Sequence, residues 1–561
     1  MERRRFDLTT VFLLAAIAFY GYLEYRLVLY ASYVPDEFLH NAWGGDIHSG
    51  IPVYAADIPG KTRLSMLLFS LAYKLADQAE DVMLINRNTV FLIVVLSLYV
   101  LFLLCRRTFG SPRGALWAVL WTLACSTFSE CSFRIRADMI ATFFALFGLY
   151  QFLALRSVGR VVAAGVCLSL AFCTTQKSVY FIVAFLVSFW VAYRRVSSNA
   201  LRDFVAFSLA GLAVFVSYIF LLGQAVGYLN VVQVTFADPW LIRTTLGKHF
   251  TWSHQYYLQT FFRNIAFYGL SFAGLGYFVR YWRSSTWEQK FLLCFSLIVL
   301  AFMMVHREPW PYVFVMVIPL LGCYAGFLSD QILGSLRTSP RILALPVIVL
   351  LFMVFVGSIF RHKAHLSVTC LPQLKTIRAA EAILDPKDSY FDGNRMIGTR
   401  KSASSLVLQL PVRAPLVTSW ETQGRLLLDE LRANQCKVII YNENRLAALP
   451  DEFHQFILDH FVLIDQNVFV SGAEITSSPR EVNLLWPGSY GLAIHGECKK
   501  IQIDGTAAKP MAEILLDAGK HQVGFEGKGS LLLIPLAARR WMEKHAVERR
   551  IEPLFPDQYN L

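Results

Sequence analysis

The chain is short of charged residues. Only 16% of its 561 residues are Asp, Glu, Lys or Arg, whereas soluble domains carry roughly a quarter. Apolar residues make up 55%, and they gather in repeated runs of the length that a bilayer span requires. This shortage excludes an ordinary soluble enzyme and predicts a membrane protein.

Several familiar signals are also missing. The ten Cys form no CxxC pair and no metal-ligand spacing. No small-residue cleavage site follows the first apolar run, so we expect that run to be retained as a membrane span. The sequence has no Gly-rich nucleotide-binding loop, no internal repeat and no low-complexity tract. A nucleotide as the immediate ligand is therefore not indicated.

Negative charge is in deficit, which leaves a formal net charge of +12. The cations are scattered through short loops and build no basic face, so we expect no nucleic-acid partner. An excess of Lys and Arg in cytoplasmic loops accounts for the charge.

Hydropathy predicts a mainly α, polytopic bundle of about eleven membrane spans. We place them near 8–30, 86–105, 113–129, 137–155, 158–173, 178–193, 203–224, 264–282, 288–305, 309–329 and 341–360. Basic residues concentrate in alternate loops, which predicts a cytoplasmic N-terminus and an outer C-terminal part.

The expected organisation has three parts. Residues 1–361 form the membrane domain, with two long outer loops at 31–85 and 225–263. The first of these loops contains an apolar stretch, 64–77, too short to cross, which favours a helix lying at the interface. Residues 362–480 alternate helix-like and strand-like segments and predict an α/β region. Residues 481–561 are β-rich, with turn signals typical of a β-sandwich.

Ionisable side chains cluster on the predicted outer face, although loops far apart in the sequence supply them. Charges at a membrane edge are costly and therefore mark candidate functional groups. They are Asp36, Glu37, Lys61, Arg63, Arg134, Arg136, Asp138, Lys177, His306, Arg307 and Glu308.

The acidic candidates are Asp36, Glu37 and Asp138. In VPDEFLH, two adjacent carboxylates can provide a general base and a charge stabiliser; alternatively, Asp36 caps a helix. In SFRIRADMIAT, Arg134 and Asp138 share a face if the segment is helical. They then form either a structural ion pair or a second acidic group whose geometry an Arg holds.

The basic candidates suit a phosphate at the membrane surface, through charge-assisted hydrogen bonds. They are Lys61, Arg63, Arg134, Lys177 and Arg307. The alternative for Lys61, Arg63 and Lys177 is contact with lipid headgroups.

The segment HREPWPYVFVMVIP adds three candidates for substrate contacts. These are His306, Glu308 and Tyr312. Tyr312 orients a phosphate or sugar, or simply joins the interfacial aromatic belt.

Four segments together resemble the GT-C superfamily of integral membrane glycosyltransferases. Within it, they are most similar to the branch of the bacterial aminoarabinose (lipid A) transferase and the protein O-mannosyltransferases. The segments are PDE after the first span, PGKTRL before the interfacial helix, RIRAD opening the fourth span, and REPWPYVFVMVIP opening a late span. The resemblance covers roughly residues 8–360. The aminoarabinose transferases often have Lys-Pro-Pro where this chain has Lys61-Thr62-Arg63, and its late loop has Arg307 rather than Lys.

The resemblance implies a function. Such enzymes move a single sugar from a polyprenyl-phosphate donor to a glycan, lipid or protein acceptor on the outer face of the membrane, with inversion by direct displacement. The absence of a WWDYG-type motif argues against transfer of a whole oligosaccharide. The resemblance also implies a multi-pass protein of a bacterial inner membrane.

The resemblance assigns roles residue by residue. Asp36 matches the base, Glu37 is its neighbour, and Asp138 matches the second acidic position. Lys61 and Arg307 match cations that meet the donor phosphate. No cofactor is required, and a divalent metal near Asp36 and Asp138 stays open.

Two other classes compete with an enzyme. A transporter or flippase of lipid-linked sugars also needs outer-face cations, but inverted repeats and helices broken near the midplane are typical of it, and the sequence shows neither. A membrane scaffold or receptor does not need carboxylates beside cations at the membrane edge. The sugar and the acceptor stay open.

Overall fold

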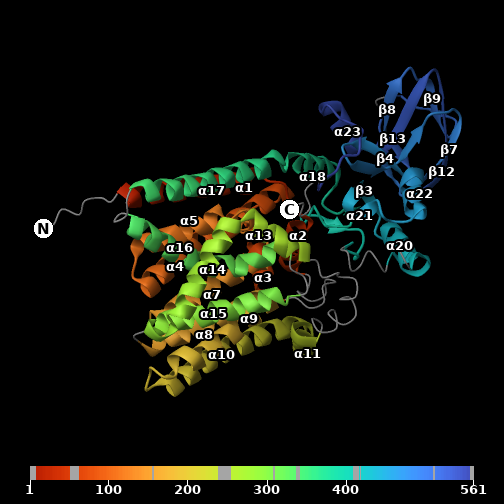
Figure 1. The fold of residues 1–561 in the computed structure, drawn as a ribbon. Coiled ribbons are helices and arrows are strands. Elements are labelled where there is room, and N and C mark those ends of the chain that lie inside the picture. Colours follow the sequence, from red (N-terminus) through yellow and green to blue (C-terminus); the bar gives the residue numbers. More distant parts are fainter. Residues whose placement is uncertain are drawn as a thin grey trace.

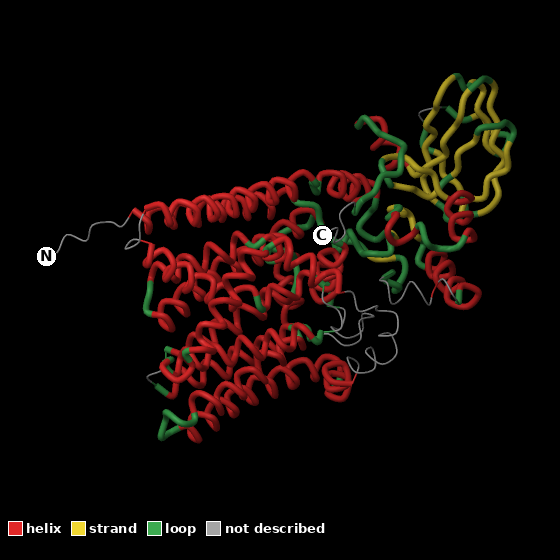
Figure 2. Tube along the Cα trace, viewed as in Figure 1, coloured by secondary structure: helices red, strands yellow, loops and turns green. Residues whose placement is uncertain are grey.

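The computed structural model describes residues 8–50, 62–154, 157–237, 254–306, 310–336, 341–408, 416, 419–509 and 512–555. Its helical part is a bundle of long helices lying side by side, and the strands gather beyond one end of that bundle (Figures 1 and 2). Helix α1 begins at the end remote from the strands. The predicted mainly α bundle with a β-rich C-terminal region is therefore confirmed.

Each of the eleven predicted spans falls on helix in the structure. The helices are α1 (Leu8–Tyr30), α4 (Ala79–Phe109), α5 (Pro112–Ala124), α6 (Ser126–Cys131), α7 (Ala137–Leu153), α8 (Val158–Thr174), η2 (Gln176–Ser178), α9 (Val179–Ser188), η3 (Phe189–Tyr193), α10 (Ala200–Val226), α14 (Ile265–Arg280), η5 (Trp282–Ser284), α15 (Trp287–Met304), η6 (Pro311–Met316), α16 (Ile318–Leu336) and α17 (Arg341–Ser367).

Within the described ranges, five helices are long and apolar enough to cross a membrane, judged by length and composition. They are Leu8–Tyr30, Ala79–Phe109, Gln176–Tyr193, Ala200–Gln224 and Trp287–Met304. Shorter apolar helices accompany them, among them Ala137–Leu153, Val158–Thr174 and Ile265–Arg280. The full count of eleven spans stays a prediction.

Small residues let the bundle helices approach closely. A Cβ atom at Gly326 of α16 would come within 2.4 Å of the Ala118 nitrogen of α5, and one at Gly165 of α8 within 2.4 Å of the Phe207 oxygen of α10. Such contacts are typical of membrane helices, whose packing cannot rely on the exclusion of water. Larger side chains at these glycines would push the helices apart.

Short helices cover the strand-facing end of the bundle. In the first outer loop these are α2 (Pro35–His48), α3 (Leu64–Ser70) and η1 (Leu71–Lys74), the last two lying on the stretch predicted to be interfacial. The described parts of the second outer loop contain α11 (Tyr228–Val232), η4 (Gln233–Ala237) and α13 (His254–Arg263).

Helix α2 is held firmly against its neighbours. The Tyr73 hydroxyl of η1 donates to the Asn41 carbonyl over 2.9 Å, and the Asn86 amide of α4 donates to the Asn41 side chain over 2.7 Å. A Cβ atom at Gly44 would lie 3.0 Å from the Phe69 backbone. This anchoring fixes the position of the acidic pair at the start of α2.

The region after the bundle begins with an α/β unit. It contains α18 (Leu371–Ile383), β1 (Ser389–Phe391), β2 (Lys401–Ser402), η7 (Trp420–Gly424), α20 (Arg425–Ala433), β3 (Cys436–Ile440), α21 (Glu443–Leu446), α22 (Asp451–His460), β4 (Phe461–Asp465) and β5 (Val468–Ser471). The strands form one mixed sheet in the order β2-β1-β3-β5-β4, parallel at β2-β1-β3 and antiparallel at β3-β5-β4.

Two four-stranded antiparallel sheets follow, in the orders β10-β9-β12-β7 and β11-β8-β13-β6. Their strands are β6 (Ala473–Ile475), β7 (Arg480–Leu484), β8 (Gly488–Gly496), β9 (Lys499–Ile503), β10 (Thr506–Ala507), β11 (Ile514–Leu516), β12 (Gly519–Glu526) and β13 (Gly529–Pro535), before a final helix, α23 (Leu536–Lys544). Both sheets contribute to one apolar core, for example Val523 from the first and Leu531 from the second. This is sandwich packing, and β6 belongs to it although it precedes the expected boundary at 481.

Candidate active site

The first turn of α2 carries the two carboxylates of the PDE motif, but they face different surroundings. Helix α2 begins after Val34, with Pro35 at its first position and Asp36 and Glu37 directly behind. Proline suits this position because no hydrogen bond of the helix needs its missing N–H. The backbone N–H of Val34 donates to the Glu37 carboxylate over 3.0 Å, so Glu37 caps the helix that carries it.

Glu37 is completely buried and surrounded by donors. Arg87 of α4 approaches it with two nitrogens, each 2.8 Å from a different carboxylate oxygen. Arg134 adds a third contact at 3.1 Å, and the Ile135 N–H a fourth at 3.3 Å. Because buried charges require such pairing, these contacts make the Glu37 cluster a fixed anchor between elements.

The charge balance at Glu37 favours the ionised form. Burial opposes ionisation of this carboxyl, but the adjacent guanidinium of Arg87, helped by Arg134, lowers the pKa of Glu37 below its ordinary value. A carboxylate held in this state accepts hydrogen bonds and is a weak proton acceptor.

Arg87 is a member of this cluster that the sequence interpretation missed. Besides Glu37, it donates to the Ala31 carbonyl over 2.7 Å and to the Ser32 carbonyl over 3.1 Å, which closes the C-terminal end of α1. Its guanidinium lies 3.6 Å from the centre of the Tyr33 ring. The available signal was an Arg in the first turn of the second predicted span, where a charge is expensive.

A second cluster surrounds Asp36 and Asp138. The Arg136 guanidinium lies between them: it forms an ion pair with Asp36, and its Nε is 3.3 Å from an oxygen of Asp138. Lys177 of η2 binds the other Asp138 oxygen over 2.8 Å. The structure thus brings together two carboxylates and two cations from distant parts of the chain.

The ring of Tyr312, in η6, forms the floor of this second cluster. The Arg136 guanidinium lies 3.3 Å from the ring centre, and the Lys177 ammonium 4.7 Å. Both distances are within the range of cation–π attraction. Tyr312 therefore helps to hold the two cations in place, in addition to any contact with a substrate.

The side chains of the second cluster differ in how much of their surface is exposed. The Asp36 and Lys177 side chains are 28% and 26% exposed, whereas Asp138 is only 5% exposed. Asp36 and Lys177 are therefore the carboxylate and the cation that a substrate can reach. Asp138 is buried and binds both Arg136 and Lys177.

The start of α7 explains why Arg136, and not Arg134, pairs with Asp138. Helix α7 begins at Ala137, so Arg134 lies before it and does not share a helical face with Asp138. The expectation of an Arg134–Asp138 pair four residues apart is wrong for this reason. Arg134 instead turns toward Glu37, and its Nε donates to the Glu130 carbonyl over 2.8 Å. Asp138, in the first turn of α7, has the placement that a helix N-terminus favours for a negative charge.

The remaining predicted residues lie as follows. His306 is hydrogen-bonded to Tyr180 of α9 over 2.8 Å, so it packs next to the helix that follows Lys177. Arg63 is buried between α3 and α10, and its backbone N–H donates to the Tyr218 hydroxyl over 2.9 Å. Lys61, Arg307 and Glu308 lie outside the described residues.

The described side chains do not suit a metal ion at this site. In the described part of the chain, no group of three or more His, Cys, Asp or Glu side chains could hold one. A guanidinium occupies the space between Asp36 and Asp138 where a bridging cation would have to sit. No catalytic step is therefore assigned to a metal held by these two carboxylates.

Comparison with solved structures identifies the fold. The crystal structure of ArnT, an aminoarabinose transferase, from Cupriavidus metallidurans in the apo state has a TM-score of 0.55 at 15% identity, and the match covers 83% of this chain and 98% of that one. ArnT bound to undecaprenyl phosphate gives a TM-score of 0.56 at 15% identity, with coverages of 82% and 97%. The oligosaccharyltransferase of Archaeoglobus fulgidus in the apo form gives 0.52 at 11% identity, with coverages of 77% and 69%.

Sequence comparison adds nothing to this. No family model matches the chain, and no curated protein matches it. The solved structures are GT-C glycosyltransferases, and at such low identity they establish the fold. The apolar helices and this likeness together show an integral membrane protein with the GT-C fold, as the resemblance in the sequence predicted.

Proposed function

We propose that this chain is a glycosyltransferase that moves a single sugar from a polyprenyl-phosphate donor to an acceptor on the outer face of the membrane. One observation carries the proposal. An accessible carboxylate, Asp36, and an accessible cation, Lys177, share one cluster in a bundle with the GT-C fold. Transfer from a phosphate leaving group needs these two kinds of side chain together.

Lys177 is the described residue best placed to meet the donor phosphate. Its side chain is partly exposed, and the Tyr312 ring and Asp138 hold its ammonium in place. A fixed cation stabilises the charge that develops on the departing phosphate. Lys61 and Arg307, which lie outside the described residues, complete the proposed phosphate site. The ArnT structure with undecaprenyl phosphate supports this donor class.

Asp36 is the proposed general base. As the acceptor oxygen attacks the anomeric carbon, its proton passes to the Asp36 carboxylate. A new carbon–oxygen bond forms, the bond from the anomeric carbon to the phosphate oxygen breaks, and polyprenyl phosphate leaves with the bonding electrons. A single displacement of this kind inverts the anomeric centre. The proton then leaves Asp36 for solvent.

Glu37 and Arg134 take positioning roles in this proposal rather than the roles in catalysis and phosphate binding expected for them. Their charges satisfy one another deep in the protein, and Arg87 completes the arrangement. They hold the start of α2, and with it Asp36, against the segment that carries Arg136. Asp138 acts in the same way by orienting Arg136 and Lys177.

The proposed orientation follows the sequence prediction. The N-terminus lies in the cytoplasm, and the short outer helices and the C-terminal domain lie on the far side of the membrane. The common end of the bundle that carries α2, α3 and the strands is consistent with this arrangement (Figure 1).

The decisive experiment is sugar transfer by the purified protein in lipid nanodiscs. Radiolabelled polyprenyl-phosphate hexoses and pentoses are offered with glycan, lipid and peptide acceptors, and the anomeric configuration of the product is read by NMR. We expect an inverted product from the wild type. Movement of intact donor across a vesicle bilayer without transfer would instead establish the flippase alternative and overturn the proposal.

A further inference from the structure

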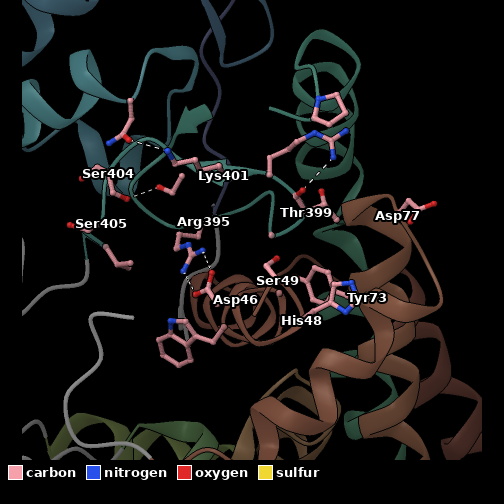
Figure 3. Close-up of a pocket in the computed structure, with 18 of the residues that line it drawn as sticks. Asp46, His48, Ser49, Tyr73, Asp77, Arg395, Thr399, Lys401, Ser404 and Ser405 are labelled. Carbon is pink, nitrogen blue, oxygen red and sulfur yellow. Dashed lines mark hydrogen bonds and ion pairs between the residues drawn. The ribbon is translucent and has the colours of Figure 1, made fainter. Parts of the chain in front are cut away.

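A large cavity lies away from the Asp36 cluster. It has a volume of about 810 Å³ and opens between the end of α2, the turn after η1 and the loop segment 395–405 that runs from β1 past β2. Figure 3 shows side chains from all three segments pointing into the same space. The membrane domain and the α/β unit therefore build this cavity jointly.

The base of the cavity is rigid. Arg395 binds Asp46 with two parallel hydrogen bonds of 2.6 Å (Figure 3). The backbones also meet closely beside this pair, because a Cβ atom at Gly45 would lie 2.7 Å from the Gly398 oxygen. A bidentate pair with so little exposure is a preorganised feature of the cavity.

The charges around the cavity cancel. Three cations line it, Arg395, Arg400 and Lys401, together with three carboxylates, Asp46, Asp77 and Glu430. A site for a phosphate group or an acidic polymer would carry an excess of cations. The balance favours a ligand that is polar and neutral.

The remaining lining is suited to hydroxyl groups. Ser405 and Asn434 offer short polar side chains, whereas the Trp43 and Tyr73 rings, which also line the cavity, are only 2% and 8% exposed. The buried Nε of Arg400 has no hydrogen-bond partner among the described residues, which points to an acceptor that a ligand or water would supply. Closely spaced donors and acceptors match the hydroxyl groups that a sugar carries on its edge.

The cavity is connected to the proposed active site by one helix. Asp36 and Asp46 are ten residues apart on α2, a rise of about 15 Å, which an oligosaccharide can span. Asp36, His40 and Trp43 occur at helical spacing on one face, and the His40 and Trp43 rings are in contact, with centres 4.9 Å apart. Trp43 also lines the cavity.

We infer that this cavity binds the neutral glycan chain of the acceptor, several sugars away from the hydroxyl that receives the new residue. The inference rests on the proposed function and names its acceptor class: a neutral oligosaccharide or polysaccharide, rather than a lipid or an unmodified protein. The distal chain binds between α2 and the 395–405 segment, while its end reaches Asp36.

The test measures binding without any donor, so that it does not depend on catalysis. Full-length protein in nanodiscs is titrated with neutral linear hexasaccharides of mannose, glucose, galactose and arabinose, and binding is followed by saturation-transfer NMR. We expect at least one of the four to bind. Ser405→Trp, which fills the cavity from an exposed position, should weaken that binding at least tenfold, and the exposed double variant Asp77→Ala/Lys401→Ala should weaken it severalfold.

Two controls make the result specific. Glu513→Ala/Lys528→Ala changes one carboxylate and one cation at exposed positions on the sandwich and should bind as the wild type does. Asp36→Asn should also retain binding, because it alters only the proposed base. In transfer assays, Asp77→Ala/Lys401→Ala should raise KM for the oligosaccharide with kcat nearly unchanged.

Three outcomes would overturn the inference. They are no binding of any of the four hexasaccharides, binding that Ser405→Trp leaves undiminished, and preferential binding of anionic phospholipid vesicles or an unglycosylated peptide. A failure of the proposed function has a different signature, since the protein would then bind the hexasaccharide but transfer no sugar to it.

Discussion

Two neighbouring ion-pair clusters involve the first turn of α2, and they use their charges differently. At Glu37 every described contact is internal: two guanidinium groups and two backbone N–H groups surround a carboxylate with no exposure. In the second cluster Arg136 is shared between Asp36 and Asp138, Lys177 binds Asp138, and Asp36 and Lys177 keep about a quarter of their side-chain surface exposed.

The difference distinguishes a structural anchor from the proposed reactive site. A buried charge whose hydrogen bonds are all satisfied stabilises one conformation, but it cannot accept a proton without losing its partners. A partly exposed carboxylate beside a cation can exchange its contacts for those of a substrate. The anchor supplies rigidity, and the second cluster uses that rigidity to position Asp36.

The largest loss of activity is expected when the proposed base, Asp36, is neutralised. Asp36→Asn should lower kcat for sugar transfer by a factor of at least about 100, within the usual range for loss of a general base. Its folding should remain normal, because Asp36 is partly exposed. Asp81→Asn, at an exposed site near the start of α4, is the matched control and should keep full activity. Wild-type turnover in Asp36→Asn would remove Asp36 from the mechanism.

A substitution of Glu37, at the centre of the buried anchor, should lower the stability of the folded protein. Glu37→Gln leaves Arg87 and Arg134 buried beside a neutral group, and breaking such a pair costs about 3–5 kcal/mol. Thermal unfolding of the purified protein in nanodiscs should show a clear drop in the transition temperature. If Glu37→Gln unfolded like the wild type but lost all turnover, Glu37 would belong to the catalytic machinery instead.

Removing the accessible cation should have a smaller effect on transfer. Lys177→Ala should lower kcat/KM for the polyprenyl-phosphate donor about ten- to hundredfold, since a hydrogen bond to a charged group contributes about 1.5–3 kcal/mol. Lys177→Arg keeps the charge and should recover part of the loss. Steady-state kinetics with donor and acceptor varied separately would test this. An effect confined to KM for the acceptor would contradict the assignment to phosphate.

A substitution of Tyr312, whose ring lies against Arg136 and Lys177, should have the smallest effect on sugar transfer. Tyr312→Leu removes a cation–π contact with Arg136 and Lys177 that contributes about 0.5–2 kcal/mol, so transfer should fall roughly threefold to thirtyfold. Tyr312→Phe keeps the ring and should retain more activity. Equal losses in the two variants would show that the hydroxyl, rather than the ring face, is the important group.

Much of this arrangement could be read from the sequence. The eleven apolar runs of the sequence fall on helices in the structure. Such runs are expected because a bilayer span needs a long stretch free of charge. The segment LLLDELRAN followed by KVIIYNE predicted a helix and then a strand, which are α20 and β3, and the turn-rich end of the chain predicted a sandwich. The order of the charged segments predicted a common outer face for Asp36, Asp138, Lys177 and Tyr312.

Other features were decided by contacts between distant residues. The sequence did not distinguish Arg134 from Arg136, because their partners depend on where α7 begins. The role of Arg87 was not predicted from the sequence. The cavity between α2 and the 395–405 segment was not predicted either, and its walls are more than 300 residues apart in the chain.

By itself, the sequence determined that the chain folds as a membrane bundle, and it predicted that charges gather at one end, since the cost of placing charge in lipid allows few alternatives. Only the tertiary structure decided which of two adjacent carboxylates is accessible. Residues 36 and 37 point in different directions from one helical turn, so Glu37 meets Arg87 and Arg134 in the interior while Asp36 meets Arg136 at the edge of the site. The burial of each charge depends on neighbours far away in the chain, and local sequence does not specify them.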